Sequence, residues 1–439
     1  MSSSAQRRVV VTGMGVVTPL GLDLDQVFEA LVAGRSGVSE ISGFSTAGLP
    51  LHHGGEAGEF TGDIANYGPL QPPQKRAIRK GQKVMCRESQ MAVAAAQRAL
   101  QHAGIVSGEH EPTRCGCSFG SDYMLTMPDD FTTSVAHCRG EDGSFVFDKW
   151  ADEGLPRMAP LWLLLYLPNM PASHIAIYND LQGPSNSLTM RESSGHLAVG
   201  EATATIQRGK ADVMLAGATG TRIHPMKTVH ALQSYQVAMG DGDPASLSRP
   251  FDAGRSGMVL GEGAGVLVLE ELEHAVARGA TIHAEVLGHA AGTACDLRCV
   301  GDDRRAMGVA MRRALENAAV PAAAVGHVHA RGLSTTLGDR GEAAALIDVL
   351  GESAGRVPVV AAKSHMGNLG AGSGVVEMVA SIMALKQGSL FPLLNFEAAD
   401  TDCPVMPARG GEEAGESCLS VAATPQGQAA AVVLGRWAS

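Results

Sequence analysis

The chain has few aromatic residues and no excess of positive charge. Aromatic residues make up 4% of its 439 residues, and 45 acidic residues outnumber 34 basic ones, which gives a formal net charge of −11. Nucleic-acid binding usually requires a basic face. The composition therefore argues against a nucleic-acid partner.

Long apolar segments are also missing. The longest purely apolar run near the middle of the chain, Leu161 to Leu167, is far too short to cross a bilayer. The apolar stretch that follows Arg7 and Arg8 contains Gly13, Gly15 and Pro19, so it fits a first β-strand better than a signal peptide. We therefore expect a soluble cytoplasmic protein without a membrane span.

The eight cysteines do not form a metal-binding pattern. Cys115 and Cys117 are separated by one residue, and Cys295 and Cys299 are four positions apart. Neither spacing is that of a zinc site. We expect reduced thiols, no metal and no cofactor.

What the chain does contain is an alternation of segments that predict strands and helices. The length allows two core-forming halves, and the alternation predicts mainly parallel sheets covered by helices. The expected strands are 8–11, 211–216, 265–269, 282–287, 326–329, 357–361, 418–422 and 429–435, and the expected helices are 24–33, 88–103, 195–208, 272–278, 304–318, 341–350 and 370–387.

Two features of this pattern define the expected domains. Thr12-Gly13 is interpreted as a turn that ends the first strand, and residues 106–170 are irregular and are interpreted as an excursion from the core. The strand–helix pattern restarts near residue 281. We therefore expect an N-terminal half over 1–275 and a C-terminal half over 276–439.

Several segments in combination resemble the elongating β-ketoacyl-acyl-carrier-protein synthases and their polyketide relatives. Thiolases have the same fold, but the motif at 249–265 favours the synthases, and Cys418 does not lie in a thiolase-like Cys-Gly loop. The resemblance implies a thiolase-like α/β fold of two similar halves in five layers, usually dimeric. The segments are 8–21, 167–172, 183–185, 211–217, 249–265, 338–339 and 363–364.

The three reactive positions of that family are all substituted. The nucleophile motif reads Met-Arg-Glu-Ser-Ser-Gly, with Glu192 at the position of the cysteine. Arg331 and Asn368 stand where the two histidines are expected, and Leu333 replaces a threonine that normally contacts pantetheine. The glycine-rich closing loop is replaced by residues 419–426. Condensation needs a thiolate nucleophile and the two histidines, so we expect no ordinary condensation.

Other family positions are retained. Lys363, Asp339, Glu342 and Glu377 match a buried charged network, which we expect to be structural, and Thr335 matches a substrate-binding position. Ser193 and Ser194 are interpreted as first-turn helix residues, and His329 and His365 as non-catalytic imidazoles.

Three functions are compatible with these substitutions. The first is a non-condensing subunit similar to polyketide chain-length factors, which pair with a catalytic synthase, although such factors often carry Gln rather than Glu at the cysteine position. The second is an altered enzyme that acts on acyl or malonyl thioesters through Glu192. The third is a scaffold that binds acyl carrier protein or acyl-CoA.

The family fold also suggests two contacts. We expect a dimer through the strand after 183–185, with a catalytic synthase rather than with a second copy. Glu192 and Arg331 replace facing residues, so we expect them to form an ion pair that closes the acyl site, joined by Asn368 or Arg191.

Overall fold

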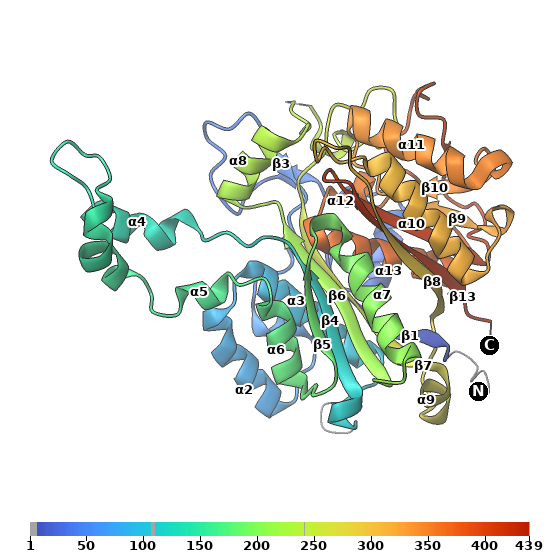
Figure 1. Cartoon of the computed structure of the whole chain (residues 1–439), viewed down its shortest axis with the longest axis horizontal. Coiled ribbons are helices and arrows are strands. Elements are labelled where there is room, and N and C mark those ends of the chain that lie inside the picture. The colour runs from blue at the N-terminus through green and yellow to red at the C-terminus, as the bar shows by residue number, and fades with distance from the viewer. Residues whose placement is uncertain (1–6, 107–109, 241, 439) are drawn as a thin grey trace.

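The computed structural model describes residues 7–106, 110–240 and 242–438. Its main sheet contains eleven strands in the order β11-β10-β9-β12-β13-β8-β1-β7-β6-β4-β5, and β2 and β3 form a separate pair (Figure 1). The strands of the N-terminal half are β1 (Val9–Val17), β2 (Ser39–Glu40), β3 (His53–Gly54), β4 (Cys115–Ser121), β5 (Ser185–Thr189), β6 (Val213–Thr221) and β7 (Glu262–Glu271). Those of the C-terminal half are β8 (Ala284–Thr293), β9 (His327–His329), β10 (Pro358–Val360), β11 (Met406–Pro407), β12 (Ser417–Thr424) and β13 (Gln428–Arg436).

The two halves have the same topology. When the two-residue strands β2, β3 and β11 are set aside, the order β5-β4-β6-β7-β1 and the order β10-β9-β12-β13-β8 both read third, second, fourth, fifth and first strand of their half. In each half the fifth strand is antiparallel to the fourth, and the second is parallel to both the third and the fourth. The first strands meet where Val10 pairs with Glu285. We propose 1–275 and 276–439 as the limits of the two halves.

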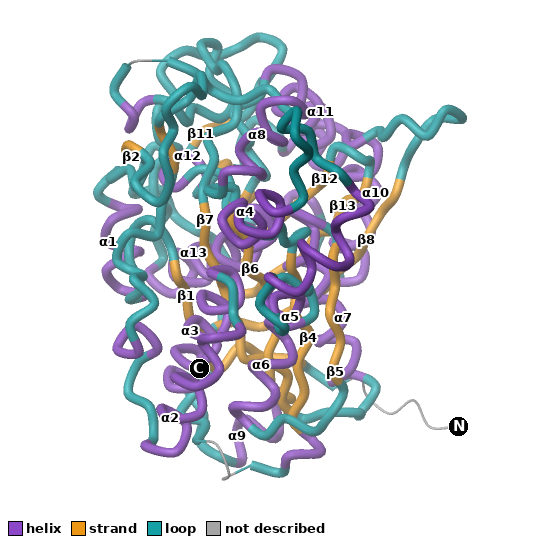
Figure 2. Tube along the Cα trace, turned by 90° about the vertical axis from the view of Figure 1, so that its left-hand side faces the viewer, coloured by secondary structure: helices purple, strands orange, loops and turns teal. Residues whose placement is uncertain are grey.

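The helices complete five layers. Helix α3 packs against β1 and β7 on one side, and α7 and α13 pack between the two halves (Figure 2). Helix α10 covers β8, β12 and β13, and α11 packs on α10. This confirms the expected thiolase-like fold class. The helices are α1 (Leu24–Val32), α2 (Pro72–Gly81), α3 (Arg87–His102), α4 (Pro128–His137), α5 (Trp162–Leu165), α6 (Met170–Asn179), α7 (Ser194–Gln207), α8 (Pro225–Ser234), α9 (Leu272–Ala277), α10 (Asp303–Ala318), α11 (Thr336–Leu350), α12 (Lys363–Met366) and α13 (Ser373–Gln387).

The prediction of a turn at Thr12-Gly13 was wrong. Strand β1 continues through Gly13 and Gly15 to Val17, with an irregularity between Val11 and Gly13. A Cβ atom on Gly13 would lie 2.5 Å from the carbonyl oxygen of Ala99, and one on Gly15 would lie 2.1 Å from that of Ala95. These glycines therefore allow helix α3 to pack directly on the strand.

The expected excursion at 106–170 was too wide at its start. Residues 115–121 form the buried strand β4, which pairs with both β5 and β6. The projecting part, which we call the arm, comprises residues 122–169 and carries α4 and α5 away from the body (Figure 1). The Cys-Gly-Cys-Ser-Phe-Gly-Ser sequence of β4 has too few β-branched residues to identify it as a strand.

Candidate active site

Glu192 lies in the short 3₁₀ turn Arg191–Ser193 that precedes helix α7. Ser194 holds this turn, because its hydroxyl donates to the carbonyl of Ser121 and accepts from the backbone N–H of Met190. Ser194 is the first residue of α7, as expected, whereas Ser193 lies one residue before the helix, at its N-cap position. Only 3% of the Glu192 surface is exposed.

The expected ion pair between Glu192 and Arg331 does not form. Glu192 Oε1 instead lies 2.5 Å from Nη2 of Arg222, and the same nitrogen lies 2.9 Å from Oδ2 of Asp122. Arg222 has no exposed side-chain surface. The carboxylate at the nucleophile position is therefore neutralised by an arginine from the N-terminal half.

Asn368 contacts Glu192, although the Glu192–Arg331 pair that Asn368 or Arg191 was expected to join does not form. Its Nδ2 donates to Glu192 Oε1 at 3.3 Å, and its Oδ1 accepts from the backbone N–H of Gly370 and the hydroxyl of Ser373. The positions of the family cysteine and second histidine are thus adjacent here. A bridge from Leu260 to Asn368 fixes the backbone of this segment.

Arg331 points into the C-terminal half. Its Nη1 donates to Asp303 Oδ2 at 2.8 Å, and its Nη2 donates to the carbonyl of Gly338 at 2.9 Å. Its backbone N–H and that of Gly332 donate to the two oxygens of Glu342. Asp303, at the start of α10, therefore provides the carboxylate that we had expected Glu192 to provide to Arg331.

Two tyrosines enclose the ion pair of Glu192. The guanidinium carbons of Arg191 and Arg222 lie 5.5 and 5.7 Å from the ring centre of Tyr123, and 5.3 and 6.0 Å from that of Tyr235. Such distances allow cation–π attraction. We call Asp122, Tyr123, Arg191, Glu192, Arg222 and Tyr235 the charged cluster.

The charged cluster determines the protonation state of Glu192. Burial alone would raise its pKa, but Arg222 and Arg191 outweigh this effect and lower the pKa to about 2. Glu192 is thus a carboxylate at neutral pH. A carboxyl group with such a low pKa is a weak general base.

The retained charged residues, Lys363, Asp339, Glu342 and Glu377, are all buried. Lys363 forms an ion pair with Glu377, and both are buried. Asp339 accepts hydrogen bonds from the backbone N–H groups of Phe251 and Leu333. Burial raises the pKa of Asp339 to about 7 and also raises the pKa values of Glu342 and Glu377.

Thr335 and the two nearby histidines have separate surroundings. Thr335 is half-buried and precedes α11. His329 accepts from the backbone N–H of Ala362 at Nε2, which leaves Nδ1 to donate to the hydroxyl of Ser381. His365 lies between the carbonyls of Arg35 and Pro392. Both imidazoles are buried away from Glu192.

Sequence reasoning missed Asp122, Tyr123, Arg222 and Tyr235. Arg222 directly follows the wholly buried strand β6, and Asp122 directly follows the wholly buried strand β4. Two opposite charges at the ends of neighbouring parallel strands were a usable signal, because such ends meet at one edge of a sheet. That signal required recognition of β4.

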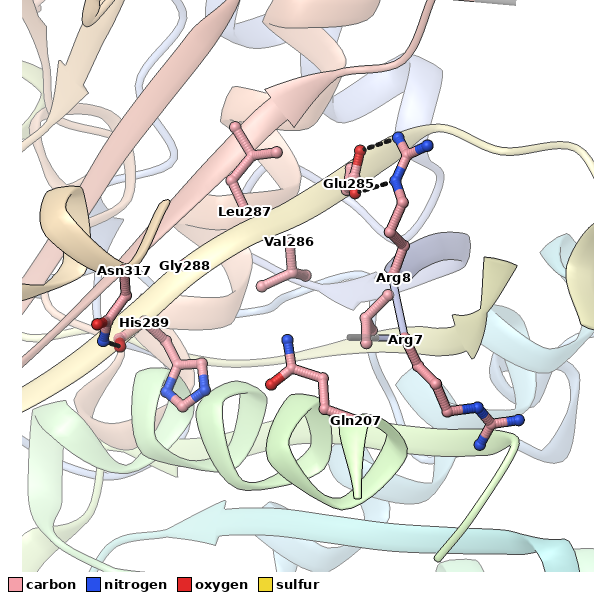
Figure 3. Close-up of a pocket in the computed structure, with 10 residues that line it drawn as sticks. Arg7, Arg8, Gln207, Glu285, Val286, Leu287, Gly288, His289 and Asn317 are labelled. Atoms are coloured by element: carbon pink, nitrogen blue, oxygen red, sulfur yellow. Dashed lines mark hydrogen bonds and ion pairs between the residues drawn. The ribbon is translucent and has the colours of Figure 1, made fainter. Parts of the chain in front are cut away.

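A groove of about 400 Å³ on the outer surface does not form part of this site (Figure 3). Arg8 donates from Nε and Nη2 to Glu285 at 2.7 and 2.5 Å, and Arg7 pairs with Asp212 at 2.8 Å. The arginines of the groove are thus already neutralised. None of the family reactive positions lines it.

The comparisons with known proteins identify the family. The model of the β-ketoacyl synthase N-terminal domain matches residues 6–275, and that of the C-terminal domain matches residues 283–397. The chain belongs to the β-ketoacyl synthase family.

Curated relatives match almost the whole chain. It is 32% identical to 3-oxoacyl-[acyl-carrier-protein] synthase 2 of Synechocystis sp. over 92% of this chain and 91% of the relative. It is 30% identical to the protein of the same name from Staphylococcus aureus over 91% of each.

Solved structures show the same fold. The ishigamide ketosynthase/chain length factor matches with a TM-score of 0.83 and 27% identity, covering 99% of this chain and all of that one. A β-ketoacyl synthase from Burkholderia phymatum matches with a TM-score of 0.83 and 28% identity, covering 98% and 100%. A complex of a type II polyketide acyl-carrier protein with its ketosynthase matches with a TM-score of 0.80 and 25% identity, covering 99% and 100%.

The ion pairs of Arg222 predict a large loss of stability when this side chain is removed. Arg222→Ala leaves Asp122 and Glu192 buried without their shared cation, which should lower the free energy of unfolding by about 3–5 kcal/mol. Glu192→Ala should cost less, because Asp122 still neutralises Arg222. Urea denaturation followed by circular dichroism measures both changes.

Arg304→Ala is the matched control for Arg222→Ala. Arg304 and its partner Asp348 are about half exposed, so this loss should stay below about 1 kcal/mol. Equal losses for Arg222→Ala and Arg304→Ala would contradict the assignment of Arg222 as the cation of the site.

Proposed function

We propose that this member of the family is a non-condensing subunit, similar to a chain-length factor, that assembles with a catalytic synthase. The observation that carries this proposal is the buried, ion-paired carboxylate of Glu192 at the nucleophile position. It lacks the nucleophilicity of a thiolate, and its Oε1 is paired with Arg222. Biosynthesis of fatty acids or polyketides is the setting that the family provides.

No other cysteine supplies the missing thiolate. Burial raises the pKa values of Cys86, Cys117 and Cys418 to about 12, so these thiols stay protonated. Burial also raises the pKa of Cys115 to about 12 and that of Cys403 to about 11, and Cys138 is buried. The two exposed cysteines, Cys295 and Cys299, lie on a hairpin after β8 rather than at a helix N-terminus. The absence of an activated thiol supports the proposal that no acyl group is transferred to the chain itself.

The second hypothesis, an altered enzyme acting through Glu192, has weaker support. A pKa of about 2 makes the carboxylate a poor base at neutral pH, and two arginines reduce its nucleophilicity. The third hypothesis, a scaffold without a synthase partner, differs from the first only in its assembly. Measurement of that assembly separates the two.

Strand β5 supports an interface with another subunit. It is the last strand of the main sheet, pairs only with β4 among the described strands, and has exposed residues at both ends. The free backbone groups of an edge strand readily pair with a second edge. A synthase subunit with the same topology offers a matching strand.

The arm exposes apolar side chains that fit a protein contact. Phe131 packs on Trp162, with ring centres 5.5 Å apart, while Phe147 remains 75% exposed. Leu161 and Leu163 are more than half exposed. Exposed apolar clusters of this kind mark interaction surfaces.

Helix α2 supplies a basic surface for an acidic acyl carrier protein. Lys75, Arg76, Arg79 and Lys80 of α2, and Lys83 of the 3₁₀ turn that follows it, are exposed, and none of them forms an ion pair with the described residues. Ile78 anchors the helix in the core. This patch stands out in a chain of net charge −11 and would steer an acidic partner.

Purified protein should form no acyl-enzyme. Incubation with acyl-loaded carrier protein should leave its intact mass unchanged, because Glu192 is held by Arg222 and the chain offers no activated thiol. A cysteine-bearing synthase treated in parallel should gain the acyl mass. Stable acylation of Glu192, mapped by peptide sequencing, would shift the assignment to the altered enzyme.

Co-expression with a cysteine-bearing synthase should give a heterodimer in native mass spectrometry. Asn186→Lys places a charge on exposed β5 and should abolish this dimer at micromolar concentration. The matched control Ser39→Lys, on the separate strand β2, should leave it intact. A monomer in the presence of the synthase would favour the scaffold hypothesis.

Charge reversal on α2 should weaken carrier-protein binding. Lys75→Glu combined with Arg79→Glu should reduce the affinity at least about tenfold at low salt, and the difference should shrink as salt is added. Calorimetric titration measures both effects. The control pair Arg312→Glu and Arg313→Glu reverses two exposed charges on α10. An equal loss in this control would place the carrier site elsewhere.

A further inference from the structure

Two histidines stack on each other where the two halves of the chain join. His102 is the last residue of α3, and His283 directly precedes β8. Their ring centres lie 4.5 Å apart, and the ring planes make an angle of 23°. The backbone N–H of His283 donates to the carbonyl of Val11 in β1 at 2.8 Å. Only two residue pairs connect β1 to β8 in the described chain, so the stacked pair lies beside a narrow junction between the halves.

The ring of His283 has no polar contact. It is 6% exposed, and neither of its nitrogens has a hydrogen-bond partner among the described residues. Buried polar atoms normally have such a partner. A proton added to this ring would place a charge where no acceptor stabilises it. The surroundings of His283 therefore favour the neutral imidazole.

His102 is held in its neutral form by a backbone group. Its Nδ1 accepts from the N–H of Met14 in β1 at 3.0 Å, so its single proton lies on Nε2. Protonation of Nδ1 would set two donors against each other and leave the Met14 N–H without its acceptor. The two rings thus oppose protonation for different structural reasons.

A nearby cation adds to this preference. Burial and the positive charge of Lys386, near the end of α13, lower the pKa of His102, and Asp25 and Asp23 at the start of α1 only partly offset them. Burial, His102 and Lys386 lower the pKa of His283 from 6.5 to about 4. Both rings are therefore neutral at pH 7.

The other carboxylates around the joint are already paired. Glu270 binds Arg278 at 2.7 Å and His274 at 2.5 Å. On β8, Glu285 binds Arg8 at 2.5 Å. These carboxylates supply no free counter-ion to a protonated ring of the stacked pair.

We propose that His102 and His283 form an acid-sensitive joint between the two halves. The neutral stacked pair holds the end of α3 against the junction of β1 and β8, and protonation of either ring opens this contact. A cavity of about 570 Å³ is lined by His102 and Lys386, so solvent protons reach the pair without unfolding of the chain. The joint does not involve Glu192 and does not depend on the proposed subunit role.

Acid weakens the closed joint. An imidazole released into solvent regains its ordinary pKa of 6.5, whereas the pKa of His283 in the closed joint is about 4. The open form therefore binds more protons between these two values. The closed form keeps its full advantage above pH 6.5 and loses it as the pH falls towards 4.

Amide hydrogen exchange of the whole protein, followed by mass spectrometry at pH 7 and pH 5, measures the opening. After correction for the intrinsic exchange rate, protection of residues 97–106 and 279–290 should fall at least about tenfold at pH 5. Peptides over β9 should keep their protection, because His327 in this strand has partners at both ring nitrogens.

Non-titrating variants should remove the acid response. His283→Phe keeps an aromatic ring for stacking, and His102→Asn keeps an oxygen that can accept from the Met14 N–H. The double variant should show the same corrected protection at pH 5 as at pH 7. His137 is exposed on the arm, so the control His137→Phe should respond to acid as the unaltered chain does.

Lys386 provides a second test at an exposed position. Lys386→Gln removes the cation beside the pair and should reduce the acid response at least about twofold, whereas Lys386→Arg keeps the charge and should leave it unchanged. An undiminished response in the double histidine variant would overturn the proposal, and so would an equal loss of protection over β9, which indicates global acid unfolding. If the double variant does not fold, equal responses of Lys386→Gln and Lys386→Arg would overturn the proposal by themselves.

Discussion

A guanidinium group without exposed surface stays charged inside a protein only if anions surround it, and Arg222 has two. Asp122 and Glu192 approach the same nitrogen from neighbouring elements, the end of β4 and the start of α7. Burial works against the charged form of Arg222, whereas these two carboxylates raise its pKa. Both anions in turn need Arg222. The arginine therefore ties the end of β4 to the start of α7.

Arg331 shows why opposite charges at facing positions of the family fold do not ensure a contact. Asp303 and the carbonyl of Gly338 lie within reach on its own half of the molecule, and its backbone is anchored by Glu342. If Arg331 lay near Glu192, it would add a third cation beside Arg191 and Arg222. With Asp303 available, each half neutralises its own buried arginine. The charged cluster thus lies within the N-terminal half, and Asn368 contacts it from the C-terminal half.

The family motifs predicted the fold class, and they named Asn368 beside Glu192 only as a member of a Glu192–Arg331 pair that does not form. They did not predict the partner of Glu192. Strand β4 has a glycine- and serine-rich sequence that does not identify it as a strand, so Asp122 at its end had no position in the expected sheet. The turn predicted at Thr12-Gly13 was wrong for a related reason, because Gly13, like Gly15, lies within strand β1. Their role is to admit α3 against β1, and that contact between distant segments is not visible in the local sequence.

The buried site at Glu192 and the exposed surfaces of the chain have different roles in the proposed function. The carboxylate of Glu192 is buried and paired with Arg222, whereas the edge of β5, the apolar side chains of the arm and the basic helix α2 are open to solvent. Replacement of the reactive residues leaves these surfaces unchanged, because they are formed by the topology of the sheet and by side chains far from Glu192. In the proposed subunit role, assembly therefore does not depend on the residues at the reactive positions, and the contacts of this chain carry the proposed function.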